Sequence, residues 1–395
     1  MKAHIAIGAN FGDEGKGQTV DYLCRQFDNC IVVRHNGGAQ AAHTVQLEDG
    51  TRHVFHHFGS GTLVGAPTYL SKHFIVNPRA FAEEAYELAD LNLGLIPTVY
   101  CHMDALLTTP YDWYINWLLE EERGEDKHGS CGMGINETVV RCETEEYRTT
   151  FSDVFDLELL RVKLDKIAEY VQKRMDLLKI EVTPHEIDVF SEQNIEQFLS
   201  DCELMKDVVT WAGDPLLLHF ENVIFEGAQG LLLDERHWFF PHVTRSKTGS
   251  DNAVDILKGL GITHADIYYV IRSYLTRHGA GPLPHEGEIE PLYDTTNIPN
   301  EHQGALRFAP LNIDLMVESI YEDLKKDIIL TPRLVVTWAH LATNNYDLPF
   351  VHFGEVTKGN ILSAINSRIR FTETILFDTP TAIPLYSYTN NSIVC

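Results

Sequence analysis

A short turn near the start of the chain combines the residue types that bind phosphate with two carboxylates. GDEGKG occupies residues 12 to 17, after the apolar run HIAIGA and before the helix-like TVDYLCRQF. A glycine-rich turn between a strand and a helix presents backbone N–H groups to an anion, and Lys16 adds positive charge. Asp13 and Glu14 would repel that anion unless one of them binds Mg²⁺ or transfers a proton. The turn therefore predicts a phosphate site that also contains a metal ligand or a base.

Two familiar nucleotide-binding patterns do not describe this turn. The Walker A pattern requires glycine where Asn10 stands and serine or threonine where Gly17 stands. The dinucleotide pattern GxGxxG occurs only in the reversed spacing of Gly12, Gly15 and Gly17. A glycine-rich turn alone is also typical of a tight strand-to-helix connection, and it is the two carboxylates that favour a functional site.

The elements that must position this turn are typical of an α/β protein. Strand-like runs recur along the chain, and several are apolar throughout, as in strands buried on both faces of a parallel sheet. Amphipathic helical segments lie between them, such as 154–180, and the acidic tract 117–129 reads as a surface loop. We therefore expect an α/β fold with a large, mostly parallel central sheet flanked by helices, in one domain spanning residues 1–395. The strand-like runs are HIAIGA, NCIVVRH, TVYCHM, NVIFEGA, IYYVIRSYL, RLVVTWA and TILFDT.

Composition and charge narrow the class of protein. The 395 residues are 44% hydrophobic and 22% charged, as in an ordinary globular protein, and no apolar run approaches the roughly 18 residues of a membrane span. The formal net charge of −26 disfavours nucleic acid and anionic membranes as partners, because they would be repelled. Seven scattered cysteines indicate reduced thiols. We expect a soluble, cytoplasmic protein.

Five motifs that follow one another in order point to a known family. They are GDEGKG, GGAQAAHT at 37–44, FEGAQGLLLD at 225–234, FPHVT at 240–244 and TRHGAGPLP at 276–284. Together they resemble the adenylosuccinate synthetase family, in order and approximate spacing, as far as about residue 315. The resemblance implies the P-loop-like fold of that family. It also implies a ligase that joins a purine nucleotide to L-aspartate with a nucleoside triphosphate and Mg²⁺.

The resemblance implies catalytic roles for Asp13, His43 and Gln229, which stand in the first three motifs. Asp13 would take the N1 proton of inosinate (IMP), so that O6 attacks the γ-phosphoryl group, and His43 would donate to the bridging oxygen. The aspartate amine would then displace the 6-phosphate. Asp13 and the backbone carbonyl of Ala42 would hold Mg²⁺, which requires a negative φ at Ala42 because the family has glycine there. The donor phosphates would lie against Gly12, Glu14, Gly15, Lys16, Gly17 and Thr44.

Residues that bind the purine nucleotide carry over from the resemblance one at a time. Gln229 would contact the base near O6 and N7, and Thr244 would hold the nucleotide phosphate. Ser130 and Cys131 stand where the family has paired threonines for that phosphate, and cysteine would contribute only its backbone N–H. Arg141 would reach into the nucleotide site of a neighbouring subunit, which implies a homodimer. Its alternative is an ordinary surface arginine.

Three departures from the family pattern affect specificity. Gln40 replaces an asparagine expected near the purine or its phosphate. The family's arginine-rich aspartate loop reads QGALRFAPLN here, so that Arg307 alone remains to bind L-aspartate. Trp338 and His340 replace the lysine and aspartate that recognise a guanine donor, and no STGP turn is found in the C-terminal LYSYTNNSIVC. We therefore expect ATP rather than GTP as donor, with Trp338 either stacked on its base or packed in the core.

Two alternative functions remain open. Phage relatives of the family use dGMP and ATP to make 2-aminoadenylosuccinates, and HGSCGMG, Gln40 and the short arginine loop are similar to that branch. The retained Asp13 favours IMP. A non-catalytic nucleotide-binding protein is the alternative of another class, but such a protein would be expected to lose Asp13, Lys16 or His43, and all three are present. The cluster of His53, His56 and His57 is not expected to bind a metal, because adjacent histidines on a strand point to opposite faces.

Overall fold

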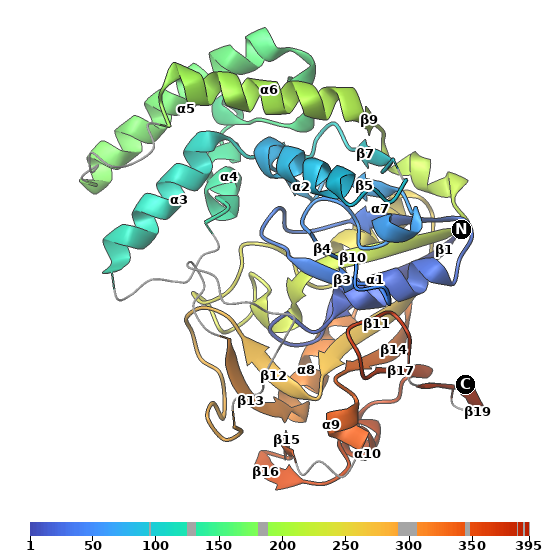
Figure 1. Cartoon of the computed structure of the whole chain (residues 1–395). Coiled ribbons are helices and arrows are strands. Elements are labelled where there is room, and N and C mark those ends of the chain that lie inside the picture. The colour runs from blue at the N-terminus through green and yellow to red at the C-terminus, as the bar shows by residue number, and fades with distance from the viewer. Residues whose placement is uncertain are drawn as a thin grey trace.

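An eleven-stranded sheet runs through the centre of the computed structural model (Figure 1). The structure describes residues 1–94, 96–124, 132–180, 189–290, 306–343, 348–384, 386–389 and 392–394. The last two strands at one side of the sheet, β18 (Tyr386–Thr389) and the edge strand β19 (Ser392–Val394), are paired antiparallel, and the other nine strands are parallel. In order across the sheet these are β17 (Glu373–Phe377), β14 (Ile329–Thr337), β11 (His264–Arg272), β1 (Lys2–Gly8), β10 (Asn222–Gly230), β2 (Cys30–Arg34), β5 (Thr68–Leu70), β7 (Val99–Cys101) and β9 (Val209–Trp211).

The central position of β1 explains its apolar sequence. Its neighbours β10 and β11 pair with it in parallel on either side. Ile5 and Ile7 belong to one hydrophobic core and Ala6 to another, so both faces of the strand are covered. The chain leaves β1 where successive strands are added to opposite sides of the sheet, a point at which α/β proteins bind ligands beyond the carboxyl ends of the strands.

The predicted strands are confirmed, and one predicted loop is wrong. Each of the seven strand-like runs contains a strand of the central sheet. The tract 117–129 does not begin as a loop, because α3 (Pro110–Arg123) continues through its first seven residues. A Thr109–Asp112 capping box starts this helix, and Tyr114, Ile115 and Leu118 bury one of its faces.

Helices and smaller sheets surround the central sheet. Helices α2, α3, α5 and α6 share a second hydrophobic core with residues of β7 and β9, and Figure 1 shows these helices at the top of the view. A four-stranded sheet lies at the bottom, formed by β12 (Tyr274–Arg277), β13 (Arg307–Asn312), β15 (Pro349–His352) and β16 (Glu355–Lys358). Short strand pairs are β3 (His43–Gln46) with β4 (Arg52–Phe55) and β6 (Ile75–Val76) with β8 (Leu106–Leu107). The remaining helices are α1 (Lys16–Arg25), α2 (Pro78–Asp90), α4 (Ile135–Cys142), α5 (Leu157–Leu178), α6 (Glu192–Val208), α7 (Asp251–Gly259), α8 (Ile313–Asp323), α9 (His340–Thr343) and α10 (Ile361–Arg368). Among the described residues, no helix combines the length and apolar character needed to cross a membrane.

Candidate functional site

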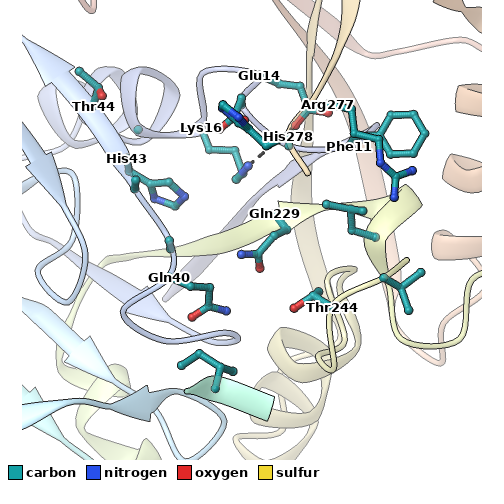
Figure 2. Close-up of a pocket in the computed structure, with 18 of the residues that line it drawn as sticks. Phe11, Glu14, Lys16, Gln40, His43, Thr44, Gln229, Thr244, Arg277 and His278 are labelled. Atoms are coloured by element: carbon teal, nitrogen blue, oxygen red, sulfur yellow. Dashed lines mark ion pairs between the residues drawn. The ribbon is translucent and has the colours of Figure 1, made fainter. Parts of the chain in front are cut away.

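A cavity of about 1100 Å³ lies at the carboxyl ends of the central strands (Figure 2). Its walls come from the turn after β1, the start of β3, the end of β10 and the segments that follow β14 and β17. The structure thus brings together most of the residues predicted from sequence, although they are far apart in the chain. Those that line the cavity are Gly12, Asp13, Glu14, Gly15, Lys16, Gly17, Gln40, Ala42, His43, Thr44, Gln229, Thr244 and Trp338.

The turn after β1 has the backbone geometry of an anion site. Gly12 and Gly15 both have φ near +96°, a conformation that favours glycine. Gly15 is the N-cap of α1 and has no side chain to occupy the N–H groups of the first helical turn, which therefore remain available to a phosphate. A Cβ at Gly17 would lie 3.0 Å from the carbonyl oxygen of Thr44, so that the serine or threonine of a Walker A motif would be crowded here.

Glu14 turns away from the anion that its backbone could bind. Its carboxylate accepts a hydrogen bond from the backbone N–H of Asn10 at 2.7 Å, and Oε2 lies 3.8 Å from Nζ of Lys16. Burial raises the pKa of Glu14 to about 7, so that much of this carboxyl is protonated at neutral pH. Lys16 therefore keeps most of its positive charge for the cavity, which resolves the repulsion that the sequence suggested.

Asp13 projects from the tip of the turn with its carboxylate partly exposed. Its φ is +59°, and Nε of Arg272 donates a hydrogen bond to its carbonyl oxygen. Ala42 lines the same cavity and is not among the residues with left-handed φ, which is the condition for its carbonyl to replace that of glycine. One carboxylate and one carbonyl, completed by phosphate oxygens and water, suit the preference of Mg²⁺. The described residues contain no cluster of three His, Cys, Asp or Glu side chains that could hold a metal alone.

Two glutamines present unpaired amide groups to the cavity. Both amide atoms of Gln40 and the Oε1 of Gln229 are buried without a hydrogen-bond partner among the described residues. Figure 2 shows both side chains pointing into the same space, with Thr244 on its far side. Buried amides are normally satisfied, so this pair is suited to hydrogen bonding with the edge of a bound heterocycle.

His43 begins β3 and points its imidazole into the cavity (Figure 2). Its Nδ1 lies 2.6 Å from Oε1 of Glu226 and 2.9 Å from Nη1 of Arg34. Burial, only partly offset by Glu226, lowers the pKa of His43 to about 4, so the ring is neutral at pH 7. Nδ1 of His43 thus contacts two charged side chains, Glu226 and Arg34, that were not predicted from the sequence.

Trp338 follows β14 and lines the end of the cavity beyond the turn. Its φ is +55°, and its ring meets Tyr274 edge to face with centroids 6.2 Å apart. Asp378, Thr379 and Pro380, which follow β17, line the same end. These three were missed, although the predicted strand TILFDT ends in Asp378 and Thr379 and β17 pairs with β14.

Residues of the TRHGAGPLP motif that carried no predicted role also reach the cavity. His278 lies opposite Asp13, with Nε2 3.5 Å from Oδ2. Arg277 stacks on Phe11, 4.6 Å from the ring centroid, and donates to the carbonyl of His242 at 2.7 Å. Burial and then the nearby Arg307 lower the pKa of Arg277 to about 10. The motif itself was the available signal, because side chains next to a glycine-rich turn commonly line a site.

Arg141 is a correction to the sequence-based prediction. It does not line the cavity, and its side chain is 1% exposed inside its own subunit. Its Nη2 lies 2.7 Å from Asp112 Oδ2, and the guanidinium also donates to the carbonyls of Leu107 and Tyr147. A guanidinium with all of these internal partners cannot also reach a neighbouring subunit, so Arg141 gives the predicted homodimer no support.

Arg307 also lies away from the position expected for it. It is not part of the cavity lining, and its guanidinium pairs with Glu286 and donates to the carbonyls of Gly279 and Gly281. These partners occupy the donors that would bind the carboxylates of L-aspartate, so this arrangement does not bear out the predicted role. Ser130 and Cys131 lie outside the described residues.

Comparison with known proteins identifies one family. The family model described as adenylosuccinate synthetase matches residues 5–303. The adenylosuccinate synthetase of Microcystis aeruginosa is 35% identical over 298 residues, which cover 73% of this chain and 64% of the relative. That of Acaryochloris marina is 33% identical over 292 residues, covering 71% and 62%. The match thus spans slightly less than two thirds of the length of these relatives.

Two solved structures share the fold. The fully ligated adenylosuccinate synthetase from Plasmodium falciparum has a TM-score of 0.69 and 20% identity, over 91% of this chain and 83% of that one. The succinoaminodeoxyadenylate synthetase of cyanophage S-2L, solved with dGMP and with dATP as an energy donor, has a TM-score of 0.61 and 16% identity. That alignment covers 99% of this chain and 96% of the phage protein.

Proposed function

Because the chain belongs to the adenylosuccinate synthetase family, we propose that it is a Mg²⁺-dependent ligase that joins IMP to L-aspartate and forms adenylosuccinate. The observation that carries the proposal is the content of one cavity. Asp13, Lys16 and His43 line it together with Gln40 and Gln229, whose amide oxygens have no hydrogen-bond partner among the described residues. A base, a cradle for the donor phosphates and groups that can read a purine edge are therefore present in one cavity, where O6 of the purine can meet the γ-phosphoryl group.

The reaction assigns a separate task to each of these residues. Asp13 removes the N1 proton, and the electron pair that this releases makes O6 the nucleophile toward the γ-phosphoryl group. Lys16 and His43 face the charge that develops as the bond to the bridging oxygen breaks. The nucleoside diphosphate leaves, the aspartate amine attacks C6, and the 6-phosphate departs as inorganic phosphate.

The same cavity suits the divalent cation that the family requires. The carboxylate of Asp13 and the carbonyl of Ala42 would hold Mg²⁺, which when bound neutralises charge on the donor phosphates. The turn that carries Asp13 is held by Arg272, whose Nε donates a hydrogen bond to the carbonyl oxygen of Asp13.

ATP is the proposed donor. His340 replaces the aspartate with which the family recognises guanine. Trp338 lines that end of the cavity, and its aromatic face can stack on any purine base. Asp378 contributes a carboxylate there from the segment after β17. Its Oδ1 lies 3.9 Å from Nδ1 of His340 and is buried without a hydrogen-bond partner in the described part of the chain. That oxygen can accept from the 6-amino group of adenine and equally from the 2-amino group of guanine, so the proposal of ATP rests on the replacement of the guanine-reading aspartate by His340.

The substrate pairs can be separated in one assay. Purified protein would be incubated with Mg²⁺, L-aspartate, either IMP or dGMP and either ATP or GTP, and the succinylated product would be measured by chromatography. Adenylosuccinate from IMP and ATP is expected. Product from dGMP but not from IMP would instead support the second candidate, a 2-aminoadenylosuccinate synthetase. The observation that favours this candidate is the likeness of the fold to the cyanophage protein over nearly the whole chain.

Asp13→Asn separates an enzyme from a non-catalytic binding protein. This variant keeps the shape of the turn but removes the base, so turnover should fall below about 1% while nucleotide affinity, measured by calorimetry, changes little. Asp49→Asn is the matched control, because Asp49 is exposed in the turn between β3 and β4. Unchanged turnover in Asp13→Asn would refute the assigned base, and an absence of product with every substrate pair would favour the binding protein.

A further inference from the structure

A buried carboxylate that does not line the cavity contacts Nδ1 of His43. Glu226 lies on the central strand β10, three residues before Gln229, and its side chain is fully buried. Its Oε1 lies 2.6 Å from Nδ1 of His43, whereas the ring of His43 points into the cavity (Figure 2). No predicted role was attached to Glu226, although it belongs to the FEGAQG motif.

Both oxygens of the Glu226 carboxylate have further polar partners, Ser60 and Arg34. Ser60 donates its backbone N–H to Oε2 at 3.0 Å and its hydroxyl to Oε1. Nη1 of Arg34 lies 3.3 Å from Oε2, and the same guanidinium donates to the carbonyl of His56 at 3.1 Å. Burial alone would raise the pKa of Glu226, but His43 and Arg34 outweigh it and hold that pKa at about 2. The group is therefore a fixed, ionised acceptor.

The distances decide which nitrogen of His43 carries the proton. An ionised oxygen 2.6 Å from an unprotonated nitrogen would oppose two lone pairs, so the contact requires a hydrogen on Nδ1. The alternative is that Arg34 donates to an unprotonated Nδ1 at 2.9 Å, which would place the ring proton on Nε2. The shorter contact and the ionised state of Glu226 favour the first arrangement, which has the logic of the carboxylate and histidine in a hydrolase triad.

We propose that Glu226 is a positioning residue, which accepts the Nδ1–H of His43 and thereby aims Nε2 at the phosphate chain of the bound donor. The inference rests on the proposed function for what Nε2 meets, but not for the hydrogen bond itself. In this tautomer Nε2 of the neutral ring carries no hydrogen, so the ring must take up a proton from solvent when the anionic donor binds. Ionised Glu226 stabilises the imidazolium that results, and its Nε2–H then donates to the phosphate chain. The dyad therefore acts on the phosphoryl-transfer step more than on nucleotide binding.

The first test reads the tautomer of His43 directly. Protein labelled with ¹⁵N-histidine would be studied by NMR, with His43 identified as the signal lost in His43→Asn. The expected signal has the proton on Nδ1 in the wild type, and in Glu226→Gln it moves to Nε2 or divides between the two nitrogens. A wild-type His43 protonated on Nε2 would overturn the proposal, even if no Glu226 variant folds.

The second test compares kinetics with a matched buried carboxylate. Glu226→Gln is expected to lower kcat by roughly 100-fold with KM changed less than about threefold, as for outer groups that orient an active-site histidine. Glu84→Gln is the control, since Glu84 is also buried, also accepts backbone N–H groups and lies beside His53 and His57, none of which lines the cavity. It should change stability but neither kcat nor the His43 signal.

The outcomes separate this inference from the proposed function. A wild-type protein without ligase activity but with His43 protonated on Nδ1 would contradict the proposed function and retain the hydrogen bond. An active wild type whose Glu226→Gln variant keeps its kcat would contradict the positioning role alone. Equal losses of kcat in Glu226→Gln and Glu84→Gln would also contradict it, because both would then reflect general loss of structure.

Discussion

His278 and Asp13 face each other across the tip of the phosphate-binding turn, with Nε2 of the imidazole 3.5 Å from Oδ2 of the carboxylate. The two residues are 265 positions apart in the chain, and they meet because β1 and β11 are neighbours in the sheet. The side chain of Asp13 is 31% exposed, so without His278 it would be free to adopt other rotamers.

We therefore predict that His278→Asn lowers kcat by about tenfold, because the proposed base loses a partner that restricts its orientation. Steady-state kinetics with saturating IMP and ATP would measure the effect. His285→Asn is the control, since His285 also pairs with a carboxylate, that of Glu288 at 2.9 Å, but does not line the cavity. An activity equal to wild type in His278→Asn would remove His278 from the mechanism.

Substitution of Trp338, at the donor end of the cavity, should affect the KM for ATP but not that for IMP. Trp338→Leu should raise the KM for ATP by about tenfold or more, because stacking on an aromatic ring contributes roughly 1 to 3 kcal/mol per base. The KM for IMP should stay near its wild-type value. Trp211→Leu serves as control, because Trp211 is exposed and outside the cavity lining. A rise of both KM values together would place Trp338 in the structure of the site rather than against the donor base.

Asp378→Asn tests which group reads the donor base. An amide can donate as well as accept, so this variant should change the ratio of kcat/KM for ATP over GTP by about tenfold, with little change in the kinetics of IMP. Both donors would be measured in parallel with the wild type and with Asp49→Asn. A ratio unaffected by the substitution would exclude Asp378 from base recognition.

The buried pair of Arg141 and Asp112 predicts a loss of stability within one subunit. Arg141→Ala leaves Asp112 as an uncompensated buried charge, which should cost about 3 to 5 kcal/mol of unfolding free energy. Urea denaturation would measure the loss, and Arg141→Lys should recover part of it. Arg141→Lys should keep its ligase activity, because Arg141 does not line the cavity. Loss of that activity, and its restoration on mixing with Asp13→Asn, would show that Arg141 acts across a subunit interface after all.

Glu84 predicts a pH dependence of stability. Burial alone would raise its pKa, but the rings of His53 and His57, whose nitrogens lie 3.8 and 3.5 Å from its oxygens, and the backbone N–H of His57 lower it from 4.5 to about 2. A lowered pKa in the folded state stabilises the protein above pH 4.5, and this contribution disappears as the pH falls toward 2. Glu84→Gln should therefore lose roughly 3 kcal/mol of unfolding free energy at pH 7, and the difference from wild type should narrow on acidification. A constant difference between pH 7 and pH 3 would contradict this assignment.

The sequence by itself determined the central strands and the phosphate-binding turn. Apolar runs such as that of β1 can be buried on both faces only in the middle of a parallel sheet, and glycine spacing marks where left-handed backbone is needed. The residues of the five motifs could also be predicted, because each motif is a short contiguous stretch whose residue types can be read directly from the sequence. The acidic end of α3 was misread, because its buried face depends on the helices packed against it.

Only the tertiary structure decided which side chains share the cavity and which do not. Arg141 and Arg307 have the charge expected of ligand-binding residues, but their partners Asp112 and Glu286 come from distant parts of the chain and engage them elsewhere. Conversely, Glu226 reaches His43 only because β10 lies beside the strands that lead to it. Charge and spacing along a chain do not reveal such pairings, since a buried charge is stabilised by the group that happens to face it in three dimensions.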